Sequence, residues 1–316
     1  MKILFIPIID PKSQGDYLEM AILHGLRKLL GENFVDYPRK KIMYHDFSDS
    51  PKNELHGQGF TMLKKPLEDI NRENVLNDRY DAVIYGSGHL RGEKPFDKKI
   101  CELADNNVWI LDGHDLYGNA DIKKIYNGEE IIGNQFSKSF KRELIFEEPT
   151  VYPTGYGIPE ESIMPIDLTR KNKLYQSTYP KHAFFEKPTD LGGNRSHHIF
   201  TNENKYYEDL STSWFGLTSI KGGWDSIRHY EIIAAGTLLL FRDYDLKPKL
   251  CSPQNLPCFS YSSKYELKRL MRKLVKKNEP TGEYIKMLEE QRSWLKTFGT
   301  TTARAGYVLD VIKSNL

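Results

Sequence analysis

The stretch SWFGLTSIKGGWDSIRHYEIIAAGTLLLFRD, from Ser213 to Asp243, decides the fold. Its first residues, Ser213 to Thr218, combine aromatic and branched side chains and predict a strand. A loop with two glycines follows, and a helix is predicted from about Ser226 to Ala235. The apolar run from Leu238 to Phe241 predicts a second strand. Strand, loop, helix and strand in this order form the unit of a parallel sheet covered by helices.

The loop and the start of this helix form a predicted anion site. The candidates for holding a phosphorylated nucleotide here are Lys221, Gly222, Gly223, Ser226, Arg228 and Glu231. The glycines leave room beside the backbone, and the amides at a helix N-terminus attract an anion such as a diphosphate. Glu231 is placed to accept hydrogen bonds from two adjacent ribose hydroxyls. A strand–loop–helix unit without a ligand is the alternative interpretation.

The first half of the chain repeats the same alternation. A helical period runs from Tyr17 to Leu30 and ends at Gly31. Strands are predicted at Ile3 to Ile9, Phe34 to Tyr37, Asp81 to Gly86, Asn107 to Asp112 and Lys141 to Glu147. Short apolar runs separated by helices are typical of strands buried on both faces of a parallel sheet.

The length of 316 residues favours two domains, because single cores rarely grow beyond about 250–300 residues. Val151 to Pro165, with three Pro and two Gly, is the predicted linker. We therefore expect an N-terminal domain over 1–155, a C-terminal domain over 156–300, and a helix over 301–316 that packs back on the first domain. Within the second domain, Ala183 to Phe185 and His198 to Thr201 predict short strands.

Composition limits the partners. The formal net charge of +2 is too small to indicate a nucleic-acid or membrane partner. Three cysteines without metal-ligand spacing, and no secretory signal or apolar run of membrane-spanning length, predict a cytoplasmic protein. Lys264 to Asn278 predicts a basic amphipathic helix. Its basic face is either a solvated surface or a contact for an anionic acceptor or a lipid surface.

The 213–243 segment resembles the donor-binding core of GT-B-fold glycosyltransferases of the bacterial and viral family 1 and 4 type. The resemblance rests on Arg228, Tyr230, Glu231, Ala234 and Gly236 before an apolar strand. It implies two Rossmann-like domains facing a cleft, a nucleoside-diphosphate sugar as co-substrate with a UDP-sugar as the first choice, and no metal or other cofactor. It also implies that Glu231 holds the donor ribose.

One position departs from the resemblance. Many retaining members carry a second glutamate, with seven residues between the two, that contacts the sugar. In this chain that position is Gly223. The departure leaves open whether the transfer inverts or retains the configuration of the sugar.

The resemblance places the acceptor on the first domain, and ligands of parallel sheets lie beyond the carboxyl ends of the strands. The candidates for a general base are Asp16, His114 and Asp115, with helix capping as the alternative role of Asp16. The candidates for the acceptor side are Gly15, Ser87, His89 and Arg91, and Arg195 is a candidate phosphate contact. A glycan is the expected acceptor; a lipid-linked sugar, a protein or a modified DNA base are alternatives.

Two other functions are alternatives to glycosyl transfer. A nucleotide- or sugar-binding module without turnover is compatible with Gly223 at the place of the sugar-contacting glutamate. A dinucleotide-dependent oxidoreductase is disfavoured, because the loop DPKSQGDY, residues 10–17, lacks the Gly-x-Gly-x-x-Gly pattern.

Overall fold

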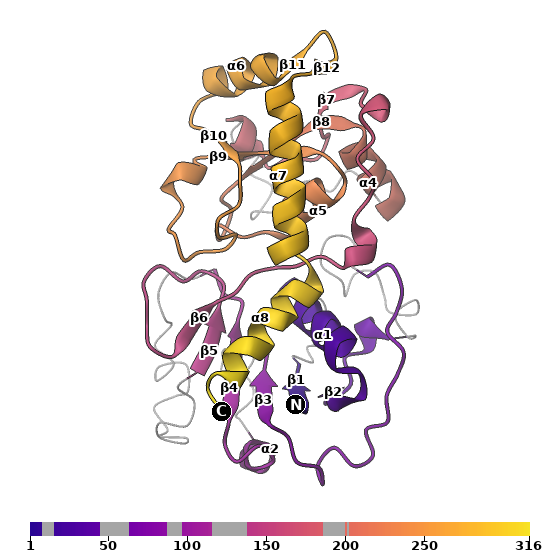
Figure 1. Cartoon of the computed structure of the whole chain (residues 1–316), viewed down its shortest axis with the longest axis vertical. Helices are drawn as coiled ribbons and strands as arrows, with labels where there is room; N and C mark the ends of the chain where they lie inside the picture. The colour runs from indigo at the N-terminus through magenta and orange to yellow at the C-terminus, as the bar shows by residue number, and fades with distance from the viewer. Residues whose placement is uncertain (8–15, 45–62, 87–96, 116–137, 186–199, 201) are drawn as a thin grey trace.

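The protein consists of two lobes stacked along its long axis (Figure 1). The computed structural model describes residues 1–7, 16–44, 63–86, 97–115, 138–185, 200 and 202–316. We call the lobe built on the strands β1 to β6 the first lobe, and the lobe built on β7 to β10 the second lobe. No described helix is long and apolar enough to cross a bilayer.

The first lobe contains a parallel sheet in the order β2-β1-β3-β4-β5-β6. Its strands are β1 (Ile3–Ile6), β2 (Phe34–Asp36), β3 (Ala82–Tyr85), β4 (Val108–Asp112), β5 (Lys138–Lys141) and β6 (Val151–Pro153). The helices are α1 (Tyr17–Leu30) and α2 (Lys98–Glu102), with the 3-10 turns η1 (Gly31–Asn33) and η2 (Lys41–Met43). The central strands are fully buried, as their uninterrupted apolar runs predicted.

The second lobe contains a smaller parallel sheet in the order β10-β9-β8-β7. Its strands are β7 (Lys173–Tyr175), β8 (Ser213–Ser219), β9 (Leu238–Arg242) and β10 (Phe259–Tyr261). The helices are α4 (Glu203–Ser211), α5 (Ile227–Ala234), α6 (Lys264–Leu274) and α7 (Gly282–Phe298), and β11 (Val275–Lys276) pairs with β12 (Glu279–Pro280). The 3-10 turns are η7 (Glu160–Ser162), η8 (Leu168–Arg170), η9 (Lys181–Phe184) and η10 (Tyr244–Leu246).

Four predicted elements differ from the structure. The strand predicted over 141–147 lies earlier, as β5, and the apolar residues Ile145 and Phe146 are exposed. Residues 151–153, predicted as linker, pair with β5 as β6. The strand predicted over 183–185 is the turn η9. The basic helix ends at Leu274, before a hairpin, and of the strand predicted over 198–201 all but Phe200 lies outside the described residues.

The chain crosses between the lobes twice, and the two crossings run side by side. The backbone of Ile158 exchanges hydrogen bonds with Gly299 and Thr301, at 2.9 and 3.0 Å. After the second crossing α8 (Thr301–Lys313) lies along α1 and inserts Val308 and Ile312 into the core of the first lobe (Figure 1). The C-terminal helix therefore belongs to the packing of the first lobe, although α7, which precedes it, belongs to the second.

Candidate functional site

The lobes meet where strands of both sheets end. The loops after β4 and β5 of the first lobe contact the loop after β8 of the second, so the interface is built from the carboxyl ends of parallel strands. Such edges are where ligands of parallel sheets bind. The segment that decided the fold therefore lies at the interface between the lobes.

The loop between β8 and α5 is fixed from within the second lobe by His229. The His229 ring is fully buried, with Nδ1 at 3.1 Å from the Thr218 hydroxyl and Nε2 at 3.0 Å from the carbonyl oxygen of Trp224. Burial lowers the pKa of His229 to about 4, so the ring is neutral at physiological pH. A neutral ring that bonds to both ends of the loop holds the backbone before α5 in place.

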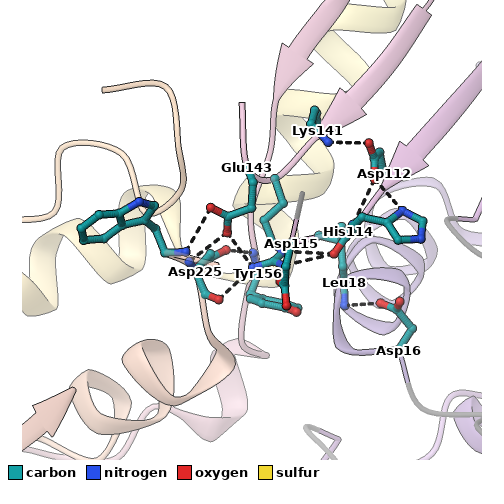
Figure 2. Close-up of polar contacts among 12 residues, drawn as sticks. Asp16, Leu18, Asp112, His114, Asp115, Lys141, Glu143, Tyr156 and Asp225 are labelled. Atoms are coloured by element: carbon teal, nitrogen blue, oxygen red, sulfur yellow. Dashed lines mark hydrogen bonds and ion pairs between the residues drawn. The ribbon is translucent and has the colours of Figure 1, made fainter. Parts of the chain in front are cut away.

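First-lobe carboxylates occupy the space beside the two glycines of this loop. The Glu143 carboxylate accepts hydrogen bonds from the backbone amides of Trp224 and Asp225, at 3.0 and 3.1 Å (Figure 2). A Cβ atom on Gly223 would lie 2.3 Å from Glu143 Oε1, and one on Gly222 would lie 2.0 Å from Asp115 Oδ2. The glycines thus permit the close approach of two side chains from the other lobe.

Arg142 is the centre of the interface network and is itself almost fully buried. Its guanidinium donates to Glu143 and to the carbonyl oxygen of Asp225, both at 2.8 Å, and it also pairs with Asp115. The guanidinium lies over the ring of Tyr156, 5.0 Å from the centroid. Burial raises the pKa of Glu143, and the Arg142 charge and the two loop amides oppose this rise.

His114 belongs to a second polar group, at the end of β4. Its Nδ1 lies 2.9 Å from Asp112 Oδ1, and the other oxygen of Asp112 accepts from Lys141 Nζ at 2.7 Å (Figure 2). Burial alone would raise the pKa of Asp112, but the hydrogen bond from His114 and the Lys141 charge hold it below its ordinary value. An ionised carboxylate on Nδ1 places the basic lone pair of a neutral imidazole on Nε2, as in acid–base dyads.

The adjacent residues His114 and Asp115, considered together in the sequence, therefore have separate partners. His114 is held by Asp112, whereas Asp115 is held by Arg142. Asp16 is the N-cap of α1 and accepts from the amides of Leu18 and Glu19, at 2.8 and 3.1 Å. The capping role weighed for Asp16 is the one that the structure shows.

Glu231 lies on α5 and is bonded to two tyrosines of α4. The Tyr206 hydroxyl donates to Glu231 Oε2 at 2.7 Å, and the Tyr207 hydroxyl to Oε1 at 3.4 Å. Burial raises the pKa of Glu231, while the Tyr206 hydrogen bond and the Arg228 charge lower it. Burial raises the pKa of Tyr17 at the start of α1, and the Glu231 charge contributes to this rise, so the carboxylate acts electrostatically on the first lobe.

The remaining candidates divide into two groups. Lys221, with an exposed side chain, and Ser226, the N-cap of α5, lie on the same loop as the glycines. Five candidates fall outside the described residues: Gly15, Ser87, His89, Arg91 and Arg195. Within the described ranges, no group of three or more His, Cys, Asp or Glu side chains is arranged to hold a metal ion.

Five residues of the interface were not predicted as site residues from the sequence: Asp112, Lys141, Arg142, Glu143 and Asp225. Three of them are the consecutive run Lys-Arg-Glu, whose side chains are buried at the end of β5. Three charged residues in succession next to a strand of a parallel sheet are the signal that would have found them, because strand ends gather at one edge.

Solved structures share the fold over nearly the whole chain. The crystal structure of HepE from Anabaena in complex with UDP matches 99% of this chain and 100% of its own, at 9% identity and a TM-score of 0.51. The N-terminal domain of trehalose-6-phosphate phosphatase from Candida albicans matches 100% of this chain and 97% of its own, at 10% identity and a TM-score of 0.53. No protein-family model and no curated protein matches the sequence.

These similarities show the class of fold. The chain has the GT-B architecture, in which two Rossmann-like domains face each other, and the predicted fold class is confirmed. At this level of identity the similarity defines the fold and not the chemistry.

Proposed function

We propose that this protein is a glycosyltransferase that moves a sugar from a nucleoside-diphosphate sugar to an acceptor hydroxyl. The proposal places the donor on the second lobe, at the loop from Lys221 to Ser226 and at Glu231. It places the acceptor on the first lobe, beside His114. The chemical requirements are a base for the acceptor and stabilisation of the departing diphosphate.

The observation that carries this proposal is the position of the Asp112–His114 pair. His114 directly precedes Asp115, whose carboxylate lies against Gly222 of the donor loop. A histidine oriented by a buried, ionised aspartate is suited to general-base catalysis. In this fold it lies on the lobe opposite the helix that carries Glu231.

In the proposed reaction His114 Nε2 takes the proton of the acceptor hydroxyl. The hydroxyl oxygen attacks the anomeric carbon, the bond from this carbon to the diphosphate oxygen breaks, and its electron pair leaves with the nucleoside diphosphate. Asp112 stabilises the imidazolium that forms. Arg228, Lys221 and the amides at the start of α5 stabilise the leaving diphosphate. This scheme inverts the sugar configuration, in keeping with Gly223 at the place of the glutamate of retaining enzymes.

The finer assignments belong to the same proposal. A UDP-sugar is the preferred donor, and HepE, which has this fold, was solved with UDP. Transfer would proceed without a metal, because the basic residues and the helix dipole supply the positive charge. A glycan is the preferred acceptor and a modified DNA base the alternative. The three free thiols, at Cys101, Cys251 and Cys258, are compatible with a reducing cytoplasm.

One observation favours the second candidate function, a nucleotide- or sugar-binding module without turnover. A diphosphate placed directly on Gly222 and Gly223 would meet the carboxylates of Asp115 and Glu143. Such a site would bind its ligand with the lobes apart and would lack a closed, reactive state. The two functions differ in turnover, so one assay separates them.

The test is a thermal-shift screen over UDP-, GDP-, ADP- and CDP-sugars, followed by calorimetry with the best nucleotide diphosphate. Glu231→Ala should weaken its binding roughly 10–100-fold, because hydrogen bonds to a charged acceptor are worth about 1.5–3 kcal/mol. His114→Ala should leave binding intact and lower turnover roughly 10²–10⁴-fold. Arg228→Ala should lower both.

Glu289→Ala, which removes an exposed glutamate of α7, is the matched control and should behave as wild type. Unchanged affinity in Glu231→Ala would remove the donor site from this helix. Nucleotide binding without hydrolysis or transfer of any donor sugar would favour the binding module.

A further inference from the structure

The two tyrosines on Glu231 form a rigid pair that the proposed reaction does not use. Tyr206 and Tyr207 are consecutive residues of α4, 7% and 5% exposed, with their rings in edge-to-face contact at 5.3 Å. Phe200 packs on Tyr206 with 6.1 Å between ring centroids. The Asn202 side chain caps the N-terminus of α4 by accepting from the amide of Lys205. Packing and capping therefore fix both phenol groups in place.

The two hydroxyls approach opposite oxygens of the same carboxylate. Tyr206 donates to Oε2 at 2.7 Å and Tyr207 to Oε1 at 3.4 Å, so the plane of the Glu231 carboxylate is held at two points. An ionised carboxylate accepts about four hydrogen bonds. One tyrosine on each oxygen thus leaves each oxygen with capacity for one more donor, which suits two neighbouring hydroxyls of a ribose.

The first lobe contacts the same pair. Lys64 Nζ lies over the ring of Tyr207, 4.2 Å from its centroid. The Lys64 charge also lowers the pKa of Glu231. The Glu231 charge in turn contributes to raising the pKa of Tyr17, at the start of α1. Tyr207 is therefore in contact with a side chain of the first lobe, and the charge of that side chain acts on the Glu231 carboxylate.

We propose that Tyr206 is a positioning residue that orients Glu231 for a ribose with both hydroxyls, so that the protein distinguishes ribonucleotides from 2′-deoxyribonucleotides. Tyr207 is the weaker second member of the pair, because its hydrogen bond is longer. The inference rests on the proposed function, which places the donor ribose on Glu231. Beyond that function, the inference assigns to Tyr206 the role of setting the geometry of the Glu231–ribose contact. It also assigns to the site a selectivity for ribonucleotides.

The physical reason for discrimination is the fixed orientation. A carboxylate that is free to rotate adapts to a single hydroxyl and loses little when the second is missing. A carboxylate held by two phenols cannot turn to compensate for a missing 2′-hydroxyl, so one of its oxygens loses one of its two hydrogen bonds, and this loss lowers the affinity. Tyr206 also favours the ionised form of Glu231 against the effect of burial, so its loss raises the pKa of Glu231 further.

The experiment compares the affinities of UDP and 2′-deoxy-UDP for the full-length protein by calorimetry between pH 5 and pH 8. Wild type should prefer UDP. Tyr206→Phe should bind UDP about tenfold more weakly, bind 2′-deoxy-UDP almost as wild type does, and lose UDP affinity at a higher pH than wild type on acidification. Tyr207→Phe should show smaller changes in the same direction, both in UDP affinity and in its pH dependence.

Tyr261→Phe is the matched control, because it also removes a buried hydroxyl of the second lobe, one that donates to the carbonyl oxygen of Ala183. It should keep both the preference and the pH profile. If Tyr206→Phe behaves as Tyr261→Phe does, while wild type binds UDP, the positioning role is wrong and the proposed function stands. If wild type binds no nucleoside diphosphate, the proposed function fails and this inference fails with it.

Discussion

At the scale of single residues, His229 links the pH to the structure of the donor loop. Burial lowers its pKa to about 4, against about 6.5 for an exposed histidine. Between these two pKa values, His229 is protonated in the unfolded chain and neutral in the folded protein. The free energy of unfolding therefore contains the full contribution of the neutral His229 ring above pH 6.5. This contribution declines by about 3 kcal/mol as the pH falls to about 4.

The variant His229→Gln tests this, because an amide can bond to Thr218 and to the Trp224 carbonyl without titrating. Urea unfolding at pH 7 and pH 4.5 should show a smaller loss of stability on acidification in His229→Gln than in wild type. His182→Gln, which replaces an exposed histidine, should keep the wild-type loss. Equal losses in all three proteins would mean that the loop does not depend on a neutral ring.

At the scale of elements, the two glycines of the loop after β8 have different tolerances. Gly223 faces Glu143, which is buried and held by Arg142 and by two backbone amides. The Glu143 side chain therefore cannot move away from a Cβ atom added at position 223. Gly222 faces Asp115, whose side chain is 54% exposed and can swing away. Gly223→Ala should cost roughly 1–3 kcal/mol of stability, and Gly222→Ala clearly less.

Thermal unfolding of both variants measures the difference. A double variant, Gly223→Ala with Glu143→Ala, removes the atoms that the new methyl group would meet, so the two costs should fall short of additive. Additive costs would show that Gly223 and Glu143 act independently and that the close approach between the lobes is absent in solution.

The elements were predictable where the signal was local. Continuous apolar runs located β1, β3, β4 and β9, because strands covered on both faces contain few polar residues. β5 was misplaced because its sequence KSFK has a single apolar residue, Phe140, whereas the neighbouring Leu-Ile-Phe run looks like a strand. In the structure Leu144 is buried, but Ile145 and Phe146 are exposed. Pairing with β4 and β6, which no local pattern records, decides where this strand lies.

The candidate site divides in the same way. The Gly-Gly loop and Glu231 lie within one short segment, so the local sequence and its resemblance to donor-binding segments were enough to predict them together. The Asp112–Lys141 pair joins residues 29 positions apart, and the Glu143–Trp224 bond joins residues 81 positions apart. Such contacts depend on the order of strands in the sheet and on how the lobes meet, which a single sequence does not encode as a readable pattern.

At the scale of the whole molecule, the lobes are joined by α8, which leaves the second lobe and packs on α1. Gly25 of α1 makes this packing possible, because a Cβ there would lie 2.0 Å from the Thr301 carbonyl oxygen and 2.7 Å from Ala305 Cβ. Backbone cannot move aside as a flexible side chain can, so Gly25→Ala must separate the two helices. Gly306 of α8 faces open space, with Leu29 Cδ1 at 4.0 Å as its nearest neighbour.

The two glycines therefore predict opposite results from the same chemical change. Gly25→Ala should lower the free energy of unfolding by roughly 1–3 kcal/mol and speed hydrogen exchange in both α1 and α8. Gly306→Ala should raise it by up to about 1 kcal/mol, since alanine favours the helix more than glycine does. Because α8 follows α7 directly, loosening it also frees the second crossing, so X-ray scattering of Gly25→Ala should report a larger radius of gyration. Wild-type stability and size in Gly25→Ala would mean that α8 does not hold the two lobes together.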